Sequence, residues 1–219
     1  MIISPFSDCT HFTTGYIQSQ FNSNISNDSL IEISGNSNSL AIPQQVHSNV
    51  VTWASSPGIY PETDGLLTKT KNLTLSLKVA DCVPVFISDF QSQIIGLVHS
   101  GWRGTVAGII PNAIKMMEEN GSSVENIHIY LGPSIGECCY EVDVEVAKNF
   151  HSESKNSLGN NKWKVSLHNQ IEISLLELDI PANQINKSNY CTFESLEFHS
   201  YRRDGEKAGR MIATMRIVN

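Results

Sequence analysis

The residues best suited to chemistry are one cysteine and two histidines near the ends of apolar segments. Cys82 follows one such segment, His99 ends the next, and His47 lies earlier, in Q-Q-V-H-S. Two imidazoles and one thiolate form a good tetrahedral donor set for zinc, with a fourth position left for water or substrate. Copper accepts the same ligand types, so the donors alone do not identify the metal.

Each of these residues also has an ordinary structural explanation. Most isolated histidines at strand ends are held by hydrogen bonds without a ligand role. A lone buried cysteine usually acts as a small apolar side chain. Cys82 and His99 could instead pair as a nucleophile and its base. The sequence spacing leaves the metal site and the dyad open as alternatives.

Alternating apolar and β-branched residues predict the strands that would position these side chains. Pro84 predicts a bulge or an irregular entry into its strand, because proline cannot donate a ladder hydrogen bond. The strands near His47, Cys82 and His99 could join one sheet. The expected strands span residues 46–53, 73–79, 83–87 and 94–98.

The turn S-G-W-R-G, which follows the second histidine, has features of an anion site. It leads into a helix predicted from Thr105 to Gly121, with Pro111 kinking the helix or marking its true first turn. Free backbone N–H groups at the helix start could hold a phosphate or carboxylate. Arg103 adds a forked donor and Trp102 a flat surface for a base or sugar. Such turns between a strand and a helix are commonly only structural.

Arg202, Arg203 and Arg210 form a local positive cluster in an acidic chain. Arginines bind phosphate through paired hydrogen bonds, so Arg202 and Arg203 are predicted phosphate contacts. The alternative is a solvated turn that pairs these arginines with Asp204 and Glu206, because surface ion pairs are common.

The remaining polar and thiol residues are interpreted more modestly. Cys138 and Cys139 are adjacent, which makes them poor at chelating one metal, and strand alternation would point their side chains in opposite directions. One of them could still line the pocket. Asp64 is interpreted mainly as a turn residue. Asp81 and Glu137 are weaker candidates for acid–base or sugar contacts.

The other segments predict the rest of the framework. The expected helices span residues 143–150 and 167–178, and a polar loop spans residues 151–162. Further strands are expected at residues 30–33, 127–131, 188–193 and 210–217.

Size and composition predict one large domain over residues 1–219. The net charge of −7 argues against a nucleic-acid surface. No apolar run approaches the roughly 18 residues of a membrane span, and the start lacks the pattern of a secretory signal. A cytoplasmic protein whose five cysteines are thiols is therefore expected.

Six segments occur in order along the chain: Q-Q-V-H-S, T-D-G-L-L-T, A-D-C-V-P-V, H-S-G-W-R-G-T, L-G-P-S-I-G-E-C-C-Y-E-V and S-Y-R-R-D-G. Together they resemble the laccase-domain family, which is labelled multicopper polyphenol oxidoreductase and also YfiH-like purine nucleoside phosphorylase. The resemblance covers about residues 40–217, and it implies an α+β fold of mixed β-sheets packed together with helices on the outside.

The resemblance also implies a function. It assigns His47, Cys82 and His99 as metal ligands and catalytic residues, usually with zinc. The implied activities are phosphorolysis of adenosine, inosine and methylthioadenosine, and deamination of adenosine. The implied partners are a nucleoside and phosphate, without nucleic acid or membrane, and a homodimer is compatible with it. The alternatives are a copper-dependent phenol oxidase, which would need more histidines, and a Cys–His hydrolase.

Overall fold

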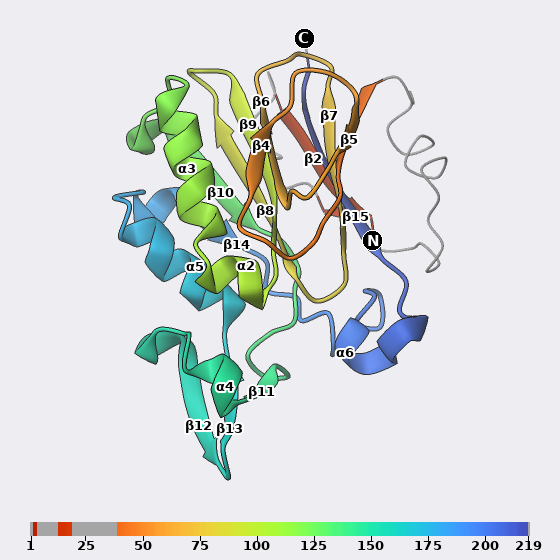
Figure 1. Ribbon diagram of the computed structural model, residues 1–219, viewed down its shortest axis with the longest axis vertical. Coiled ribbons are helices and arrows are strands. Elements are labelled where there is room, and N and C mark those ends of the chain that lie inside the picture. The colour runs from red at the N-terminus through yellow and green to blue at the C-terminus, as the bar shows by residue number, and fades with distance from the viewer. Residues whose placement is uncertain (1, 4–12, 19–38, 219) are drawn as a thin grey trace.

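Two six-stranded sheets form the body of the protein. The computed structural model describes residues 2–3, 13–18 and 39–218, so the strand predicted at residues 30–33 lies outside the described residues. Figure 1 shows the two sheets side by side, with the two longest helices along one side.

The central sheet carries the strands that matter for chemistry. Antiparallel neighbours β8 and β9 lie in its middle, while β4 pairs with β6, and β14 with β10, in parallel. Its order is β14 (Ile185–Lys187), β10 (Ile127–Leu131), β8 (Val83–Asp89), β9 (Ile94–Ser100), β6 (Gly65–Thr68) and β4 (Val51–Trp53).

The outer sheet is also mixed, because β3 pairs in parallel with β5 and β7, whereas β15 is antiparallel to β7. Its order is β1 (Ile2–Ile3), β2 (Thr13–Gln18), β15 (Met211–Ile217), β7 (Thr74–Val79), β3 (Leu40–Pro43) and β5 (Gly58–Tyr60). A third, three-stranded sheet projects from the body, with the order β11 (Glu141–Asp143), β13 (Lys162–Val165) and β12 (Lys155–Gly159).

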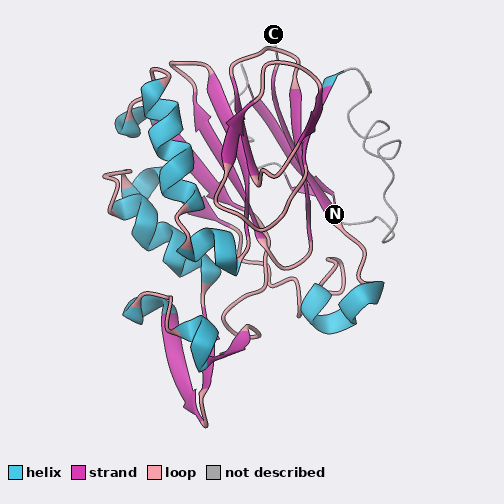
Figure 2. Cartoon of the chain, viewed as in Figure 1, coloured by secondary structure: helices cyan, strands magenta, loops and turns pink. Residues whose placement is uncertain are grey.

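Helices cover the face of the central sheet that points away from the outer sheet, as the cartoon in Figure 2 shows. Two of them, α3 (Ile109–Glu119) and α5 (Leu167–Leu176), pack there. The shorter helices are α2 (Trp102–Val106), α4 (Val144–Ala147) and α6 (Tyr201–Asp204). Single 3-10 turns span Val124–Asn126, Ser152–Ser154, Ala182–Gln184 and Gly205–Lys207.

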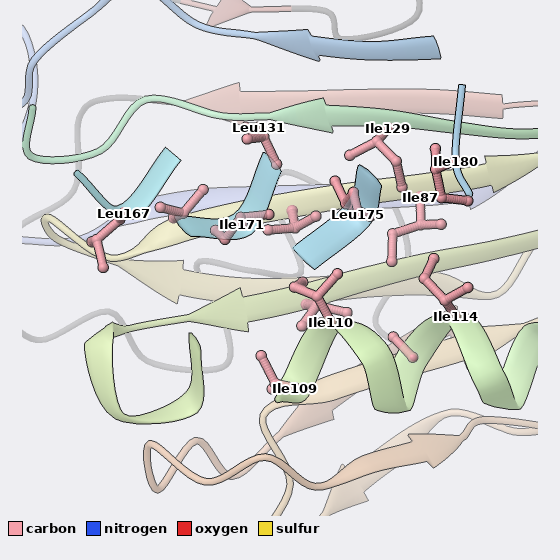
Figure 3. Close-up of a cluster of buried hydrophobic side chains, with 14 of the residues drawn as sticks. Ile87, Ile109, Ile110, Ile114, Ile129, Leu131, Leu167, Ile171, Leu175 and Ile180 are labelled. Atoms are coloured by element: carbon pink, nitrogen blue, oxygen red, sulfur yellow. The ribbon is translucent and has the colours of Figure 1, made fainter. Parts of the chain in front are cut away.

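The central sheet is buried on both faces, which explains why β8 and β9 read as continuous apolar runs. Val85 and Ile87 belong to the helix-side core, together with Ile110 of α3 and Ile171 of α5. Phe86, between them in sequence, belongs to the separate core shared with the outer sheet. Figure 3 shows the side chains of the helix-side core facing the strands. The predicted α+β fold of packed mixed sheets with outer helices is confirmed.

Several element predictions are confirmed and others are corrected. The strands at 127–131 and 210–217 and the helix at 167–178 are present, the last two with slightly shorter bounds. The strand predicted at 46–53 begins only at Val51, so the first histidine lies in a loop. Pro84 causes no bulge, because pairing of β8 with β9 runs without a register shift from Val83 to Asp89. Residues 188–193 form no strand; Cys191 makes only an isolated bridge with Ser134.

The helix predicted from Thr105 is wrong at its start. The chain forms α2 first, and Gly108, with φ of 83°, breaks it from α3. Pro111 lies in the first turn of α3, where its missing N–H costs nothing. The predicted polar loop at 151–162 contains a hairpin instead, whose tight turn uses Asn160 and Asn161 at positive φ. Asparagine tolerates that conformation better than most residues.

Candidate metal centre

The structure brings His47, Cys82 and His99 together, with their ligand atoms within 4.8 Å of one another. Cys82 immediately precedes β8 and His99 lies in β9, so the pairing of these two strands places both at one rim of the central sheet. The loop after β3 supplies His47, whose ring centroid lies 4.9 Å from that of His99. The three predicted ligands thus form one cluster.

Asp64 organises this cluster, a larger role than the turn residue predicted from the sequence. Its fully buried carboxylate accepts a hydrogen bond of 2.8 Å from Nδ1 of His99. The same oxygen accepts the backbone N–H of His47 at 3.0 Å. Its other oxygen accepts the backbone N–H of Ser48 at 2.7 Å and the Ser48 hydroxyl at 2.8 Å. One carboxylate therefore orients one imidazole and holds the loop that carries the other.

This bonding has two consequences for ligand geometry. Because Asp64 engages Nδ1 of His99, the other ring nitrogen, Nε2, is left for a metal, as in carboxylate–histidine–zinc arrangements. His47 adopts a φ of 62°, a left-handed conformation that is uncommon for histidine. The contacts from Asp64 to the surrounding backbone offset that strain.

The charges of the cluster favour an ionised Cys82 beside a protonated His99, so a metal bound at Nε2 of His99 would have to displace a proton there. Burial raises the pKa of the Cys82 thiol, but hydrogen bonds from His47 and His99 outweigh it and lower that pKa to about 6. Burial lowers the pKa of His99, but Asp64 and Cys82 raise it to about 9. Burial also opposes ionisation of Asp64, yet its bonds to His99 and Ser48 hold its pKa well below the usual range. The lowered pKa favours the thiolate of Cys82, the form that binds metals and also the form that attacks as a nucleophile.

Two glycines of the turn S-G-W-R-G make room for the cluster. A Cβ at Gly101 would lie 2.9 Å from the Cys82 sulfur and 3.2 Å from the His47 ring. A Cβ at Gly104 would lie 2.7 Å from the backbone carbonyl oxygen of Ser48. Both positions need glycine because neighbouring atoms approach closely, and both neighbours belong to the cluster or its loop.

Gly104→Ala should therefore push the loop of His47 away and weaken metal binding. Overpacking of this kind costs about 1–3 kcal/mol of stability. Metal affinity, measured by competition with a chromophoric chelator, should fall together with the melting temperature. Gly96→Ala is the matched control, since it crowds Leu67 within the core and should lower the melting temperature alone. Equal metal affinity in both variants would contradict the role given to Gly104.

A cavity of about 680 Å³ opens beside the cluster. Its size is in the range of small-molecule sites. Besides the cluster, its wall combines cationic and aromatic side chains in a protein whose net charge is −7. These are Lys78, Arg103, Arg202, Arg210, Trp102, Tyr140 and Tyr201.

Two arginines of the cavity wall are held against aromatic rings. The Arg103 guanidinium lies 4.6 Å from the centre of the Trp102 ring, and that of Arg202 lies 5.0 Å from the centre of Tyr140. Arg202 also donates to the Glu141 carbonyl oxygen at 2.7 Å. Such cation–π contacts fix the direction of an otherwise flexible side chain.

Arg203 does not line the cavity, so its predicted contact with phosphate gains no support from the cavity wall. Its guanidinium donates to the carbonyl oxygens of Thr192 at 2.9 Å and Phe198 at 2.8 Å, and it pairs with Asp204. These contacts favour the alternative interpretation, a structural turn, for this arginine. The structure also gives no support to the predicted anion site at the start of the helix. The helix that begins there, α2, has only five residues. The hydroxyl of Thr105 donates to the Gly101 carbonyl oxygen within this helix start.

The weaker candidates have structural partners. Asp81 lines the cavity, but its carboxylate accepts the Thr192 hydroxyl and the backbone N–H of Arg202, both at 2.6 Å. The Glu137 carboxylate accepts a hydrogen bond from the Asn156 side chain, and Glu137 lies outside this cavity.

Lys78 and Tyr140 also line the cavity, although no sequence motif predicts a role for them there. Lys78 follows Ser76 at the two-residue spacing of β7, and both line the cavity. That polar alternation in an otherwise apolar strand was the available signal. For Asp64 the signal was its place in T-D-G-L-L-T, a segment that carried the resemblance.

The comparison that decides the family is the match of residues 21–218 to the model described as multi-copper polyphenol oxidoreductase laccase. The chain belongs to this laccase family. The match begins earlier than the resemblance seen in the sequence, which started near residue 40.

Relatives within the laccase family carry a different name. The purine nucleoside phosphorylase YlmD of Bacillus subtilis is 35% identical over 159 residues, which cover 69% of this chain and 57% of that protein. A purine nucleoside phosphorylase of Deinococcus radiodurans is 32% identical over 78% of this chain and 67% of its own length. The chain thus spans little more than half of the Bacillus subtilis protein and two thirds of the other.

Solved structures of similar proteins have the same fold. YlmD from Geobacillus stearothermophilus superposes with a TM-score of 0.89 at 23% identity, covering 98% of this chain and 94% of its own. The YfiH protein of Bacillus licheniformis has a TM-score of 0.86 at 24% identity, covering 94% of this chain and 93% of its own. Within the described residues of this laccase-family chain, no helix is long and apolar enough to cross a membrane.

Proposed function

We propose that this chain is a metal-dependent purine nucleoside phosphorylase that acts on adenosine, inosine and methylthioadenosine and also deaminates adenosine. The observation that carries the proposal is the three-donor cluster of His47, Cys82 and His99 in the wall of a cationic, aromatic cavity of about 680 Å³. The names of the relatives support the phosphorylase part. The deaminase part rests on the family resemblance alone.

The donor set fits a single metal ion with an open position. Two imidazoles and a thiolate suit Zn²⁺, and they also suit copper. Metal bound there would act as a Lewis acid towards an oxygen of water or substrate. Asp64 would fix His99 in the tautomer that leaves Nε2 free for the metal.

Phosphorolysis requires the chain to hold a phosphate next to the ribose. A phosphate oxygen forms a bond to C1′, the bond from C1′ to the purine nitrogen breaks, and the leaving purine takes up a proton. Arg103, Arg202 and Lys78 would offset the phosphate charge from the cavity wall. The aromatic rings behind both arginines keep the guanidinium groups in place.

A phenol oxidase with several coppers fits the cluster less well. In the described part of the chain, the cluster contains only two histidines and one cysteine. A hydrolase with Cys82 as nucleophile is favoured by its thiolate and by His99, but the second imidazole, His47, beside the same sulfur has no role in a dyad. A metal-binding protein without catalytic activity remains the third alternative.

The proposed activity is tested by incubating the purified protein with adenosine, inosine or methylthioadenosine, with and without phosphate, and separating the products by chromatography. Free purine that forms only with phosphate supports phosphorolysis, and inosine formed from adenosine supports deamination. Chelated protein and protein reloaded with Zn²⁺ or Cu²⁺ show whether turnover needs the metal. The absence of turnover with every purine tested would overturn the proposal, and oxidation of a phenol by the copper-loaded protein would favour the laccase activity.

Arg103→Ala and Arg202→Ala should each raise the KM for phosphate by about tenfold, the effect expected when one hydrogen bond to a charged group is lost. The KM for the nucleoside should change less. Steady-state kinetics with phosphate as the varied substrate measures the difference. Arg216→Ala is the control, because Arg216 lies on β15 outside the cavity lining. Unchanged phosphate KM in both cavity variants would place phosphate elsewhere.

A further inference from the structure

A second group of metal-ligand side chains lies outside the main cavity. The three sulfurs of Cys138, Cys139 and Cys191 and a carboxylate oxygen of Glu194 lie within 4.8 Å of one another. We propose that these four residues bind one Zn²⁺ ion that joins two loops of the cavity wall. The proposal is independent of the nucleoside activity.

A turn makes it possible for adjacent cysteines to share one ion. The backbone N–H groups of Cys139 and Tyr140 both donate to the Gly136 carbonyl oxygen at 3.0 Å, so the two cysteines lie on a turn, not on a strand. The alternation predicted from the sequence, which would separate their side chains, is therefore wrong. Both sulfurs reach the cluster.

The third cysteine comes from the other loop and is held in place there. Cys191 forms an isolated bridge with Ser134, and its sulfur accepts the backbone N–H of Gly136 at 3.2 Å. A Cβ at Gly136 would lie 3.1 Å from the Cys138 sulfur and 3.4 Å from the Cys191 sulfur. Glycine thus leaves the space that both sulfurs face.

The donor chemistry selects a soft divalent cation. Thiolates favour zinc and similar metals over magnesium or calcium. Zn–S bonds of about 2.3 Å in a tetrahedron place sulfurs about 3.8 Å apart, which agrees with the observed spacing within 4.8 Å. Binding forms three Zn–S bonds and one Zn–O bond, and the three thiol protons pass to solvent. Cys138 and Glu194 are exposed, and with Cys191 they line a cavity of about 260 Å³, so an ion can enter from solution.

The ion would stabilise the wall of the main cavity. The first loop carries Ile135 and Tyr140, and the second leads into α6, which carries Arg202. All three residues line the main cavity. Tying the loops together would keep Arg202 over the ring of Tyr140. The expected role is structural, comparable to that of closed thiolate zinc sites.

Metal analysis of the reduced, full-length protein tests the proposal. Wild type loaded with Zn²⁺ should bind two ions, Cys82→Ser should retain one, and the double variant Cys138→Ser/Cys191→Ser should also retain one. In the Cys82→Ser background, Co²⁺ should give intense thiolate charge-transfer bands and the visible bands of a tetrahedral site. Glu194→Gln should weaken this site, whereas Glu197→Gln, on the same loop but outside the cluster, should not.

The outcomes separate the two sites. If the Cys82→Ser protein binds no metal, or the double cysteine variant still binds two ions, the second site is disproved. A disulfide among the three cysteines that persists under reducing conditions and blocks metal uptake would also overturn it. If the first cluster binds no metal, wild type holds one ion that Cys82→Ser keeps, so failure of the proposed function stays distinguishable. Cys139→Ser, followed by circular dichroism, gives the same test should the double variant fail to fold.

Discussion

Asp64→Asn should lower the metal affinity of the His47, Cys82 and His99 cluster by about 10–100-fold, the usual effect of losing a partner that orients a ligand. Both carboxylate oxygens of Asp64 accept hydrogen bonds, one from His99 and His47 and the other from Ser48. An amide would present an NH₂ group to one of these sets of donors, whichever way it turned. The effect should be visible in metal titration and in nucleoside turnover.

Asp89→Asn is a demanding control for that variant. Asp89 is also a buried carboxylate, at the end of β8. Within the described part of the chain, only its Oδ1 accepts hydrogen bonds, from the backbone N–H groups of Gln91 and Ser92, and Oδ2 has no partner. An asparagine can keep the first set and point its NH₂ to the second position. If both variants lose metal equally, the effect belongs to fold stability and not to Asp64.

Cys82→Ala should abolish both metal binding at the cluster and nucleoside turnover. Two imidazoles alone hold zinc weakly, because the thiolate supplies the negative charge of the site. The sulfur lies in the cluster between both histidines, and an alanine cannot replace it. Elemental analysis and the chromatographic assay, made on the same preparation with an unchanged circular dichroism spectrum, measure the two losses together.

The Cys82→Ala variant also distinguishes the two interpretations of Cys82, as a metal ligand and as the nucleophile of a Cys–His dyad. A Cys82→Ala protein that binds as many ions as the wild type, and so keeps the metal at His47 and His99, but loses turnover would support the nucleophile and reject Cys82 as a ligand. Cys191→Ser is the matched control, since this cysteine belongs to the other cluster and its loss should leave the metal at His47 and His99 in place.

The parts of the fold that could be predicted from the sequence are the elements whose buried side chains recur at a regular spacing. Strands such as β10 and β15 and the helix α5 bury one face or both, so their apolar spacing is visible over several residues. The candidate ligands His47, Cys82 and His99 could also be predicted from the sequence, because histidine and cysteine are among the few residue types that commonly bind metals. Family resemblance then connected three segments that spacing alone could not connect.

Long-range polar contacts explain the errors. The conformation of the loop that carries His47 depends on the carboxylate of Asp64, which lies 17 residues away in the chain. No local sequence pattern reveals such a contact. The partners of Arg203 could not be predicted, because backbone carbonyl oxygens of a folded loop, as well as the carboxylate of Asp204, accept its hydrogen bonds. Cys138 and Cys139 were misjudged because the turn through Gly136 depends on where the neighbouring loop lies.

The exposed position of His47 has a consequence for how fast metal would exchange. Cys82 and His99 are anchored at the rim of a sheet buried on both faces, whereas His47 lies on a loop and is exposed. A metal held by all three would therefore be released by way of His47, which can swing out while the other two stay fixed. Dissociation should be governed by the opening of one loop, and the contacts of Asp64 with that loop would set the residence time of the ion.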